Sequence, residues 1–147
     1  MIIAGSRSPF VSDKIIKMFT KEKGIRNRVS FIFDPSDEKL RDLYLRARGF
    51  LYPGVENFNM MILEAASNGC PSITCKESGV FELFEGKCEE LFTEQNDIEK
   101  FAEITESLLH DEKKTISEGK KQYKVAINYT TETHMEKLIK IIGEIEI

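Results

Sequence analysis

Apolar and polar residues alternate along the chain with two different spacings, which predict strands followed by helices. Short apolar runs that end near glycine, proline or aspartate are predicted to be strands, at residues 1–5, 28–34, 49–52, 71–75 and 89–92. Between and after them, apolar residues at helical spacing and helix-capping residues predict helices, at residues 11–23, 36–47, 58–68, 80–84, 96–109, 111–127 and 131–142.

Two details of these elements are specific enough to be checked. Asn96 followed by Glu99 has the spacing of a capping box, so Asn96 is predicted to cap the helix at residues 96–109. In the helix expected to begin near Phe58, we expect Phe58 and residues 60–63 to lie in the core.

Strands that alternate with helices indicate a mainly parallel sheet with helices on both faces. We therefore expect an α/β protein with a Rossmann-like, three-layer α/β/α domain. In such folds, ligands bind at the carboxyl ends of the strands. Three segments with suitable chemistry follow predicted strands, at residues 5–8, 33–35 and 52–59.

Composition and charge exclude several classes of protein. The 147 residues are 41% hydrophobic and 31% charged with a net charge of −4, as in one globular domain rather than a disordered chain or a basic nucleic-acid binder. No apolar stretch is long enough for a transmembrane segment, and the first residues are too short an apolar run for a signal peptide. We expect a cytoplasmic protein.

The cysteines and histidines give no sign of a metal site. Cys70, Cys75 and Cys88 are an odd number without metal-like pairing, so we expect buried, reduced thiols. His110 and His134 lie too far apart in sequence to form a ligand pair and are expected on helix surfaces.

Glu56 and Glu64 stand eight positions apart at the start of an apolar run and within it. With a helix beginning near Phe58, Glu56 lies at its positive end and Glu64 about 9 Å further along the axis. The free N–H groups between them could bind an anion. Two carboxylates that accept hydrogen bonds from hydroxyls, on either side of an anion site, suit a nucleotide-diphosphate sugar.

The segments around the two glutamates follow a recognisable order. The chain has Glu56-Asn57-Phe58-Asn59, then Glu64-Ala65, and then Gly69-Cys70-Pro71-Ser72-Ile73. A strand ending in Gly5 precedes them, as do a strand at 29–33 and a helix from Ser36, and Ser78-Gly79 to Leu83 follows. Together these segments resemble GT-B glycosyltransferases of the "glycosyl transferases group 1" type. The resemblance covers nearly the whole chain.

The resemblance implies the donor-binding half of a GT-B architecture, in a retaining glycosyltransferase of glycan biosynthesis. The donor would be a UDP-, GDP- or ADP-sugar, with no cofactor and no metal ion. Glu56, the predicted catalytic residue, would contact donor-sugar hydroxyls, and Glu64 would accept hydrogen bonds from the ribose. The remaining donor-binding residues would be Gly5 and Ser6 on the phosphate side, Phe33 beside the base, and the main-chain N–H groups of Asn57, Phe58, Asn59 and Met60.

The chain departs from the family pattern in two ways. Asn57 and Asn59 stand where the family has glycines, although asparagine tolerates the left-handed backbone better than most residues. Residues 1–147 also correspond to a partial C-terminal domain, without the N-terminal acceptor domain and the first βα unit. We therefore expect the chain alone to be inactive and to need that missing domain, a partner chain or a second copy. A complete enzyme could associate peripherally with a membrane.

Three functions remain open at this level. The chain could be the donor-binding part of an enzyme that transfers a sugar to a saccharide or lipid-linked acceptor. It could instead be a non-catalytic, degenerate donor-binding or assembly module. A generic nucleotide-binding or flavodoxin-like domain is less well supported, because Gly5-Ser6 lacks a GxGxxG or Walker pattern.

Overall fold

A computed structural model of the chain describes residues 1–6, 13–22 and 24–144. These residues form two compact units, Met1–Leu43 and Tyr44–Ile147. Each unit is described by itself below. All strand pairs found in the described residues are parallel, which confirms the predicted α/β class.

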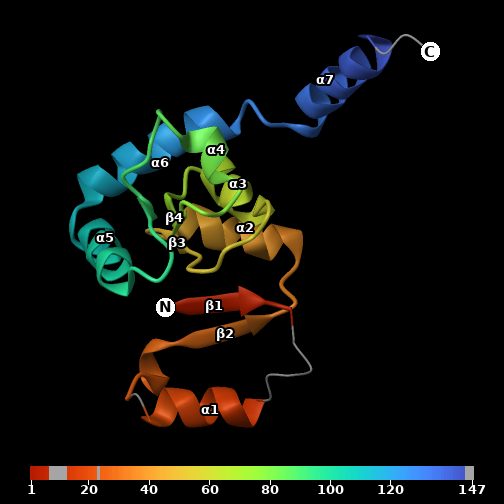
Figure 1. Cartoon of the computed structure of the whole chain (residues 1–147). Helices are drawn as coiled ribbons and strands as arrows, with labels where there is room; N and C mark the ends of the chain where they lie inside the picture. Colours follow the sequence, from red (N-terminus) through yellow and green to blue (C-terminus); the bar gives the residue numbers. More distant parts are fainter. Residues whose placement is uncertain (7–12, 23, 145–147) are drawn as a thin grey trace. The chain divides into compact units, whose positions relative to one another are not determined.

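The first unit contains a parallel pair of strands, β1 (Ile2–Gly5) and β2 (Ser30–Phe33) (Figure 1). Parallel strands need a crossover connection, and here it includes helix α1 (Asp13–Glu22) and the 3₁₀ helix η1 (Arg26–Arg28). The predicted beginning of the first helix, at residues 11 and 12, lies outside the described residues. Helix α2 (Asp37–Arg46) follows β2.

Strand β1 is exposed along its whole length, which is unusual for a parallel strand. Ile2 and Ile3 point to opposite faces of the sheet, and they are 53% and 44% exposed. Within the described residues β1 pairs only with β2, so its second edge has no partner strand. The first unit therefore has an open, apolar strand edge.

The second unit is built on a three-stranded parallel sheet in the order β3-β4-β5. The strands are β3 (Phe50–Leu51), β4 (Ser72–Cys75) and β5 (Phe92–Thr93), and all four residues of the central strand β4 are buried. The helices of this unit are α3 (Met60–Ser67), α4 (Phe81–Phe84), α5 (Ile98–His110), α6 (Glu112–Ala126) and α7 (Thr131–Glu144).

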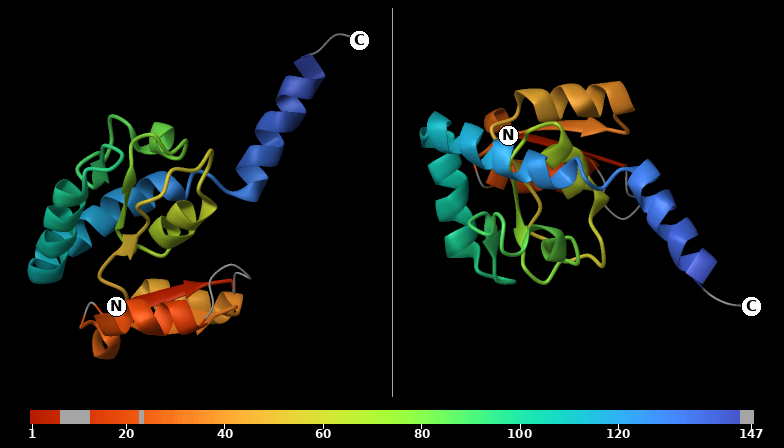
Figure 2. Two further views of the ribbon diagram at one scale, coloured as in Figure 1. Left: turned by 60° about the horizontal axis from the view of Figure 1, so that its bottom comes forward. Right: turned by 90° about the horizontal axis from the view of Figure 1, so that it is seen from above.

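Helices cover both faces of the β3-β4-β5 sheet. Neighbouring residues of a strand point to opposite faces, so their contacts show what covers each face. Phe50 packs against a core cluster formed mainly by α3, α4 and α6, whereas Leu51 packs against a second cluster, in which α5 contributes Ile104 and Leu108. Helix α6 packs against α3, α4 and α5, as can be followed in the two views of Figure 2. The second unit thus has the predicted three layers.

Helix α6 is joined to the sheet through buried polar and close backbone contacts. Gln122 is fully buried, and its side-chain amide accepts a hydrogen bond from Ser72 N at 2.7 Å and donates one to Ser72 O at 3.0 Å. One turn earlier, a Cβ on Gly119 would stand 2.2 Å from Gly69 O. Gln122 thus supplies the hydrogen bonds that a further strand would make, and Gly119 allows the close approach.

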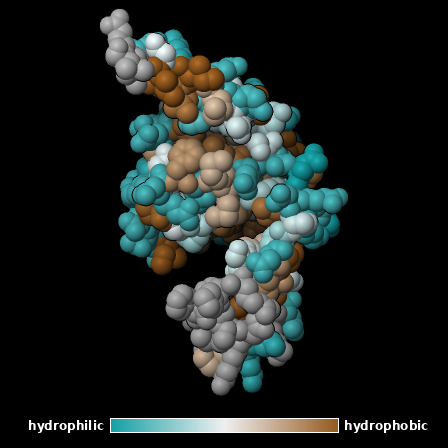
Figure 3. Space-filling view, turned by 90° about the vertical axis from the view of Figure 1, so that its right-hand side faces the viewer, coloured by the Kyte–Doolittle hydropathy of each residue, from teal (hydrophilic) through white to brown (hydrophobic). Residues whose placement is uncertain are grey.

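Helix α7 has no buried residue, although its apolar positions follow the predicted helical stripe. Met135, Leu138, Ile139 and Ile142 are all at least 40% exposed. Figure 3 shows hydrophobic surface, in brown, at this end of the chain. The helix was correctly predicted, whereas sequence periodicity alone gives no information on whether its apolar face is covered.

Several predicted boundaries were wrong, among them those of α3, α5 and β5. Helix α3 begins at Met60 rather than near Phe58, because Asn59 caps it. Asp97, not Asn96, caps α5 by accepting a hydrogen bond from Lys100 N, and Asn96 has a positive φ of 66°. The last strand comprises Phe92 and Thr93 instead of residues 89–92.

Candidate functional site

The loop between β3 and α3 carries Glu56 and lies against the backbone of Gly79. Gly79 N donates a hydrogen bond to Glu56 O at 3.1 Å. A Cβ on Gly79 would stand only 1.8 Å from Asn57 O, so no side chain fits there without a shift of the backbone. The main chain of the loop is therefore fixed at Glu56 and Asn57.

Two side chains from the segment after β4 fix the beginning of the same loop. The Cys75 thiol donates a hydrogen bond to Pro53 O at 3.3 Å, and the Ser78 hydroxyl donates one to Gly54 O at 3.4 Å. Ser78 and Gly79 belong to the segment that the sequence resemblance singled out downstream of Glu64. The segment at residues 75–79 therefore holds the main chain of the Glu56 loop through hydrogen bonds to its carbonyl oxygens.

Asn59 is fully buried and acts as the N-cap of α3. Its Oδ1 accepts a hydrogen bond from Met61 N at 3.1 Å, and its buried Nδ2 has no partner within the part of the chain that the structure describes. With φ at −89°, Asn59 does not use the left-handed conformation, and Asn57 is not among the described residues with positive φ. Asparagine in place of glycine thus serves helix capping here, not an unusual backbone.

Main-chain N–H groups remain free at the start of α3. Within the described residues, no hydrogen bond is donated by the N–H groups of Asn57, Phe58, Asn59 and Met60. The side chains of Phe58 and Met60 are 45% and 57% exposed, and that of Met61 is 37% exposed. The expectation that these three side chains lie in the core was therefore wrong, whereas Ile62 and Leu63 are buried as predicted.

The carboxylate of Glu56 is exposed, and the hydroxyl of Tyr52 donates a hydrogen bond to its Oε1. This hydrogen bond, followed by burial and the negative charge of Glu56, raises the pKa of Tyr52. Sequence reasoning placed Tyr52 in the candidate segment 52–59 but gave its side chain no role. The signal for a role was its position four residues before Glu56, at the end of a predicted strand.

Glu64 lies on the first turns of α3 with an exposed side chain, near Tyr44 on the last turn of α2. Burial raises the pKa of Tyr44 to about 12, and the charge of Glu64 adds to this. The centroids of the Tyr44 and Phe50 rings lie 5.6 Å apart, edge to face, and the buried Tyr44 hydroxyl has no hydrogen-bond partner among the described residues. The Glu64 carboxylate is thus directed to the surface beside a tyrosine.

The other predicted residues lie together in the first unit. Gly5 and Phe33 are register partners at the carboxyl ends of β1 and β2, and Ser6 follows Gly5. Asp34 N donates to Gly5 O at 3.0 Å, and Asp34 has a positive φ of 47°. The structure therefore gathers the predicted residues into two groups, Gly5, Ser6 and Phe33 in one unit and residues 56–64 in the other.

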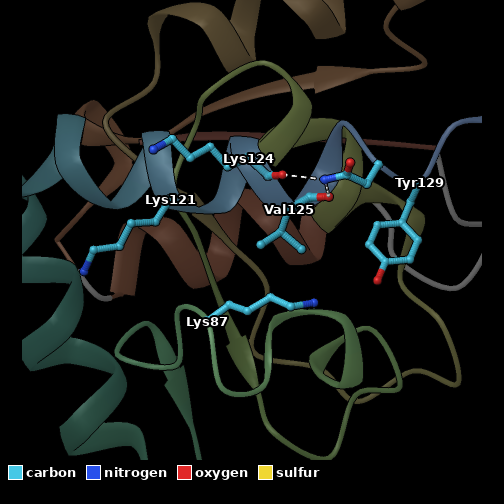
Figure 4. A pocket seen from close by; sticks show the side chains of 6 residues that line it. Lys87, Lys121, Lys124, Val125 and Tyr129 are labelled. Carbon is cyan, nitrogen blue, oxygen red and sulfur yellow. Dashed lines mark hydrogen bonds between the residues drawn. The ribbon is translucent and has the colours of Figure 1, made fainter.

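A separate cavity of about 440 Å³ contains none of the predicted residues. It lies beside α6 and is lined by Lys87, Lys121, Lys124, Val125, Asn128 and Tyr129. In Figure 4 the ammonium groups of the three lysines point in different directions, and Lys121 is already paired with Glu90 and Glu118. This arrangement does not form a convergent anion site.

The described part of the chain shows neither a metal-binding cluster nor a membrane-spanning helix. No group of three or more histidine, cysteine, aspartate or glutamate side chains could hold a metal ion. No described helix is both long enough and apolar enough to span a membrane.

Comparison with a family model identifies the chain. Residues 1–130 match the model of the family described as glycosyl transferases group 1. The chain belongs to this family. The predicted resemblance is therefore confirmed. In a separate comparison, no curated protein matches the chain.

Solved structures show the same fold. Sucrose-phosphate synthase (tll1590) from Thermosynechococcus elongatus has a TM-score of 0.83 at 21% identity, over 99% of this chain and 39% of that one. Alr3699/HepE from Anabaena, in complex with UDP-glucose, has a TM-score of 0.81 at 20% identity, over 98% of this chain and 40% of that one. The catalytic domain of cholesterol-alpha-glucosyltransferase from Helicobacter pylori has a TM-score of 0.70 at 17% identity. The match covers 88% of this chain and 79% of that one. The chain thus spans about two fifths of the first two structures.

Proposed function

We propose that this chain binds a nucleotide-diphosphate sugar as the donor-binding part of a retaining glycosyltransferase. The observation that carries the proposal is the row of free N–H groups at residues 57–60, which lies between the exposed carboxylates of Glu56 and Glu64. Family membership and the UDP-glucose bound by Alr3699/HepE support this donor class. The acceptor would be a saccharide or a lipid-linked molecule.

Each group has a role that follows from its chemistry. The free N–H groups and the positive end of α3 would stabilise the charge of the diphosphate. Glu56 would accept hydrogen bonds from donor-sugar hydroxyls near the reacting bond, and Glu64 would accept them from the ribose, since ionised carboxylates are strong acceptors. Gly5 and Ser6 would line the phosphate side, and Phe33 would lie beside the base. No cofactor or metal ion is needed for this binding.

The remaining catalytic groups would come from chain outside residues 1–147. We propose that residues 1–147 are a partial C-terminal domain, completed by an acceptor domain, a partner chain or a second copy. The purified chain alone would then transfer no sugar. Turnover of any nucleotide sugar by the 147-residue chain would contradict this.

Calorimetric titration with UDP-, GDP- and ADP-sugars tests the donor role. One nucleotide should be preferred, and Glu64→Ala should weaken its binding about 10- to 100-fold, because a hydrogen bond to a charged group is lost. Glu106→Ala is the matched control, since Glu106 is also an exposed helical glutamate but lies on α5. Chelation of divalent ions should leave the affinity unchanged.

One observation favours a second function, a non-catalytic, degenerate donor-binding or assembly module that needs a partner chain. The Asn59 side chain occupies the Met61 N–H, which would otherwise be available to an anion. If wild-type protein binds none of the three donor classes, this second function is the better one.

A further inference from the structure

The hydroxyl of Tyr52 makes a side-chain contact with the predicted catalytic carboxylate that the proposed function does not use. Tyr52 directly follows β3, and its main-chain N–H donates to Ile73 O at 3.0 Å, so its backbone belongs to the sheet. Its ring then crosses the loop and reaches Glu56, four residues later. A group anchored in the sheet thus holds a group in the loop.

Gly54 makes this crossing possible. A Cβ on Gly54 would stand 2.9 Å from Tyr52 Cε1 and 3.2 Å from both Cζ and the hydroxyl oxygen. The tyrosine ring therefore lies directly over the glycine, where a larger residue would displace it. This close packing sets the position of the hydroxyl along the loop.

Glu56 is consequently held both at its main chain and at its carboxylate. Its carbonyl oxygen accepts the hydrogen bond from Gly79 N, and its Oε1 accepts the one from Tyr52. The second carboxylate oxygen, Oε2, has no partner among the described residues and belongs to an exposed side chain. A carboxylate with one oxygen occupied and one free presents a single, oriented acceptor.

We infer that Tyr52 is a positioning residue, which orients the Glu56 carboxylate so that Oε2 accepts a hydrogen bond from a hydroxyl of the donor sugar. This role rests on the proposed function. It concerns the sugar only, because the diphosphate would meet main-chain N–H groups further along the loop. A preorganised acceptor binds more tightly, since less side-chain freedom is lost on binding.

The test combines two substitutions, singly and together, with two kinds of ligand. Wild type, Tyr52→Phe, Glu56→Ala and the double variant are titrated with UDP-, GDP- and ADP-glucose and with the free nucleoside diphosphates. Tyr52→Phe should weaken binding of the preferred nucleotide sugar about 3- to 10-fold and leave binding of its diphosphate unchanged. In the Glu56→Ala background it should have no effect. Tyr123→Phe, at an exposed tyrosine of α6, is the matched control.

The outcomes separate this role from the proposed function. If the wild type binds a nucleotide sugar and Tyr52→Phe binds it equally well, the positioning role is wrong and the donor site stands. An equal loss for sugar and diphosphate, or a loss that persists without Glu56, would show a merely structural tyrosine. If no donor binds to the wild type, both proposals fail.

A measurement without ligand checks the contact itself. In an alkaline titration of tyrosine absorbance, the contribution of Tyr52, obtained by difference from Tyr52→Phe, should move to lower pH in Glu56→Ala. This follows because the hydrogen bond to Glu56 is the main cause of the raised pKa of Tyr52. An unchanged titration would overturn the contact and the role that depends on it.

Discussion

The substitution Gly79→Ala is the sharpest perturbation of the Glu56 loop. The added Cβ would lie 1.8 Å from Asn57 O, whereas ordinary contact begins near 3.4 Å, so the two main-chain segments must separate by roughly 1.6 Å. The hydrogen bond from Gly79 N to Glu56 O, now 3.1 Å, would then be broken. Overpacking of about 1–3 kcal/mol and a lost hydrogen bond of about 1 kcal/mol give a total destabilisation of about 2–4 kcal/mol.

This loss is smaller than the usual stability of a domain, so the variant should still fold at 25 °C. Urea unfolding followed by circular dichroism should show the lower stability. Calorimetry should show at least tenfold weaker donor binding, because Glu56 moves by more than the tolerance of a hydrogen bond. Gly143→Ala is the matched control. Gly143 lies in helix α7, and a Cβ added there would have no atom within 4 Å. Unchanged unfolding and binding in Gly79→Ala would refute the reasoning.

Three further predictions concern stability. Gln122→Ala should lower the free energy of unfolding by about 2–5 kcal/mol, because it leaves the buried N–H and C=O of Ser72 without partners; a loss below 1 kcal/mol in urea unfolding would contradict this. Asp97→Ala should cost about 1 kcal/mol through the lost cap of α5, whereas Asn96→Ala should not show this loss of capping. Burial raises the pKa of the Cys70 thiol from 9.0 to about 12, so the unfolded chain releases this proton first. Unfolding free energy should therefore fall as the pH rises from about 9 to 12, and less steeply in Cys70→Ala.

The sequence predicted the elements well because strand and helix periodicities are local. It placed every helix and strand of the second unit in the correct order, and it predicted helices on both faces of the sheet. Some of its errors lie at helix ends, where neighbouring residues compete for the same cap. Asn96 and Asp97 are both good capping residues, and the left-handed conformation of Asn96 leaves the cap to Asp97.

The sequence predicted those parts of the candidate site that lie within one short segment, but not the contacts that hold them in place. The sequence put forward Glu56 and Glu64 because one short segment contains both. The structure adds that the candidates Gly5 and Phe33 are register partners. Tyr52 lies in the predicted segment 52–59, but its contact with Glu56 could not be predicted, since that contact depends on the absence of a Cβ at Gly54. The support from Gly79 joins segments more than twenty residues apart, which no local pattern reveals.

The way in which Gly79 and Ser78 hold the Glu56 loop has a consequence for variation at this site. Their contacts reach the loop through main-chain atoms, while the side chains of Asn57, Phe58 and Met60 project outward. The backbone path can therefore stay constant while these three side chains change. A combinatorial library at these positions should yield folded proteins at high frequency, and it offers a direct route to altered ligand preference on an unchanged frame.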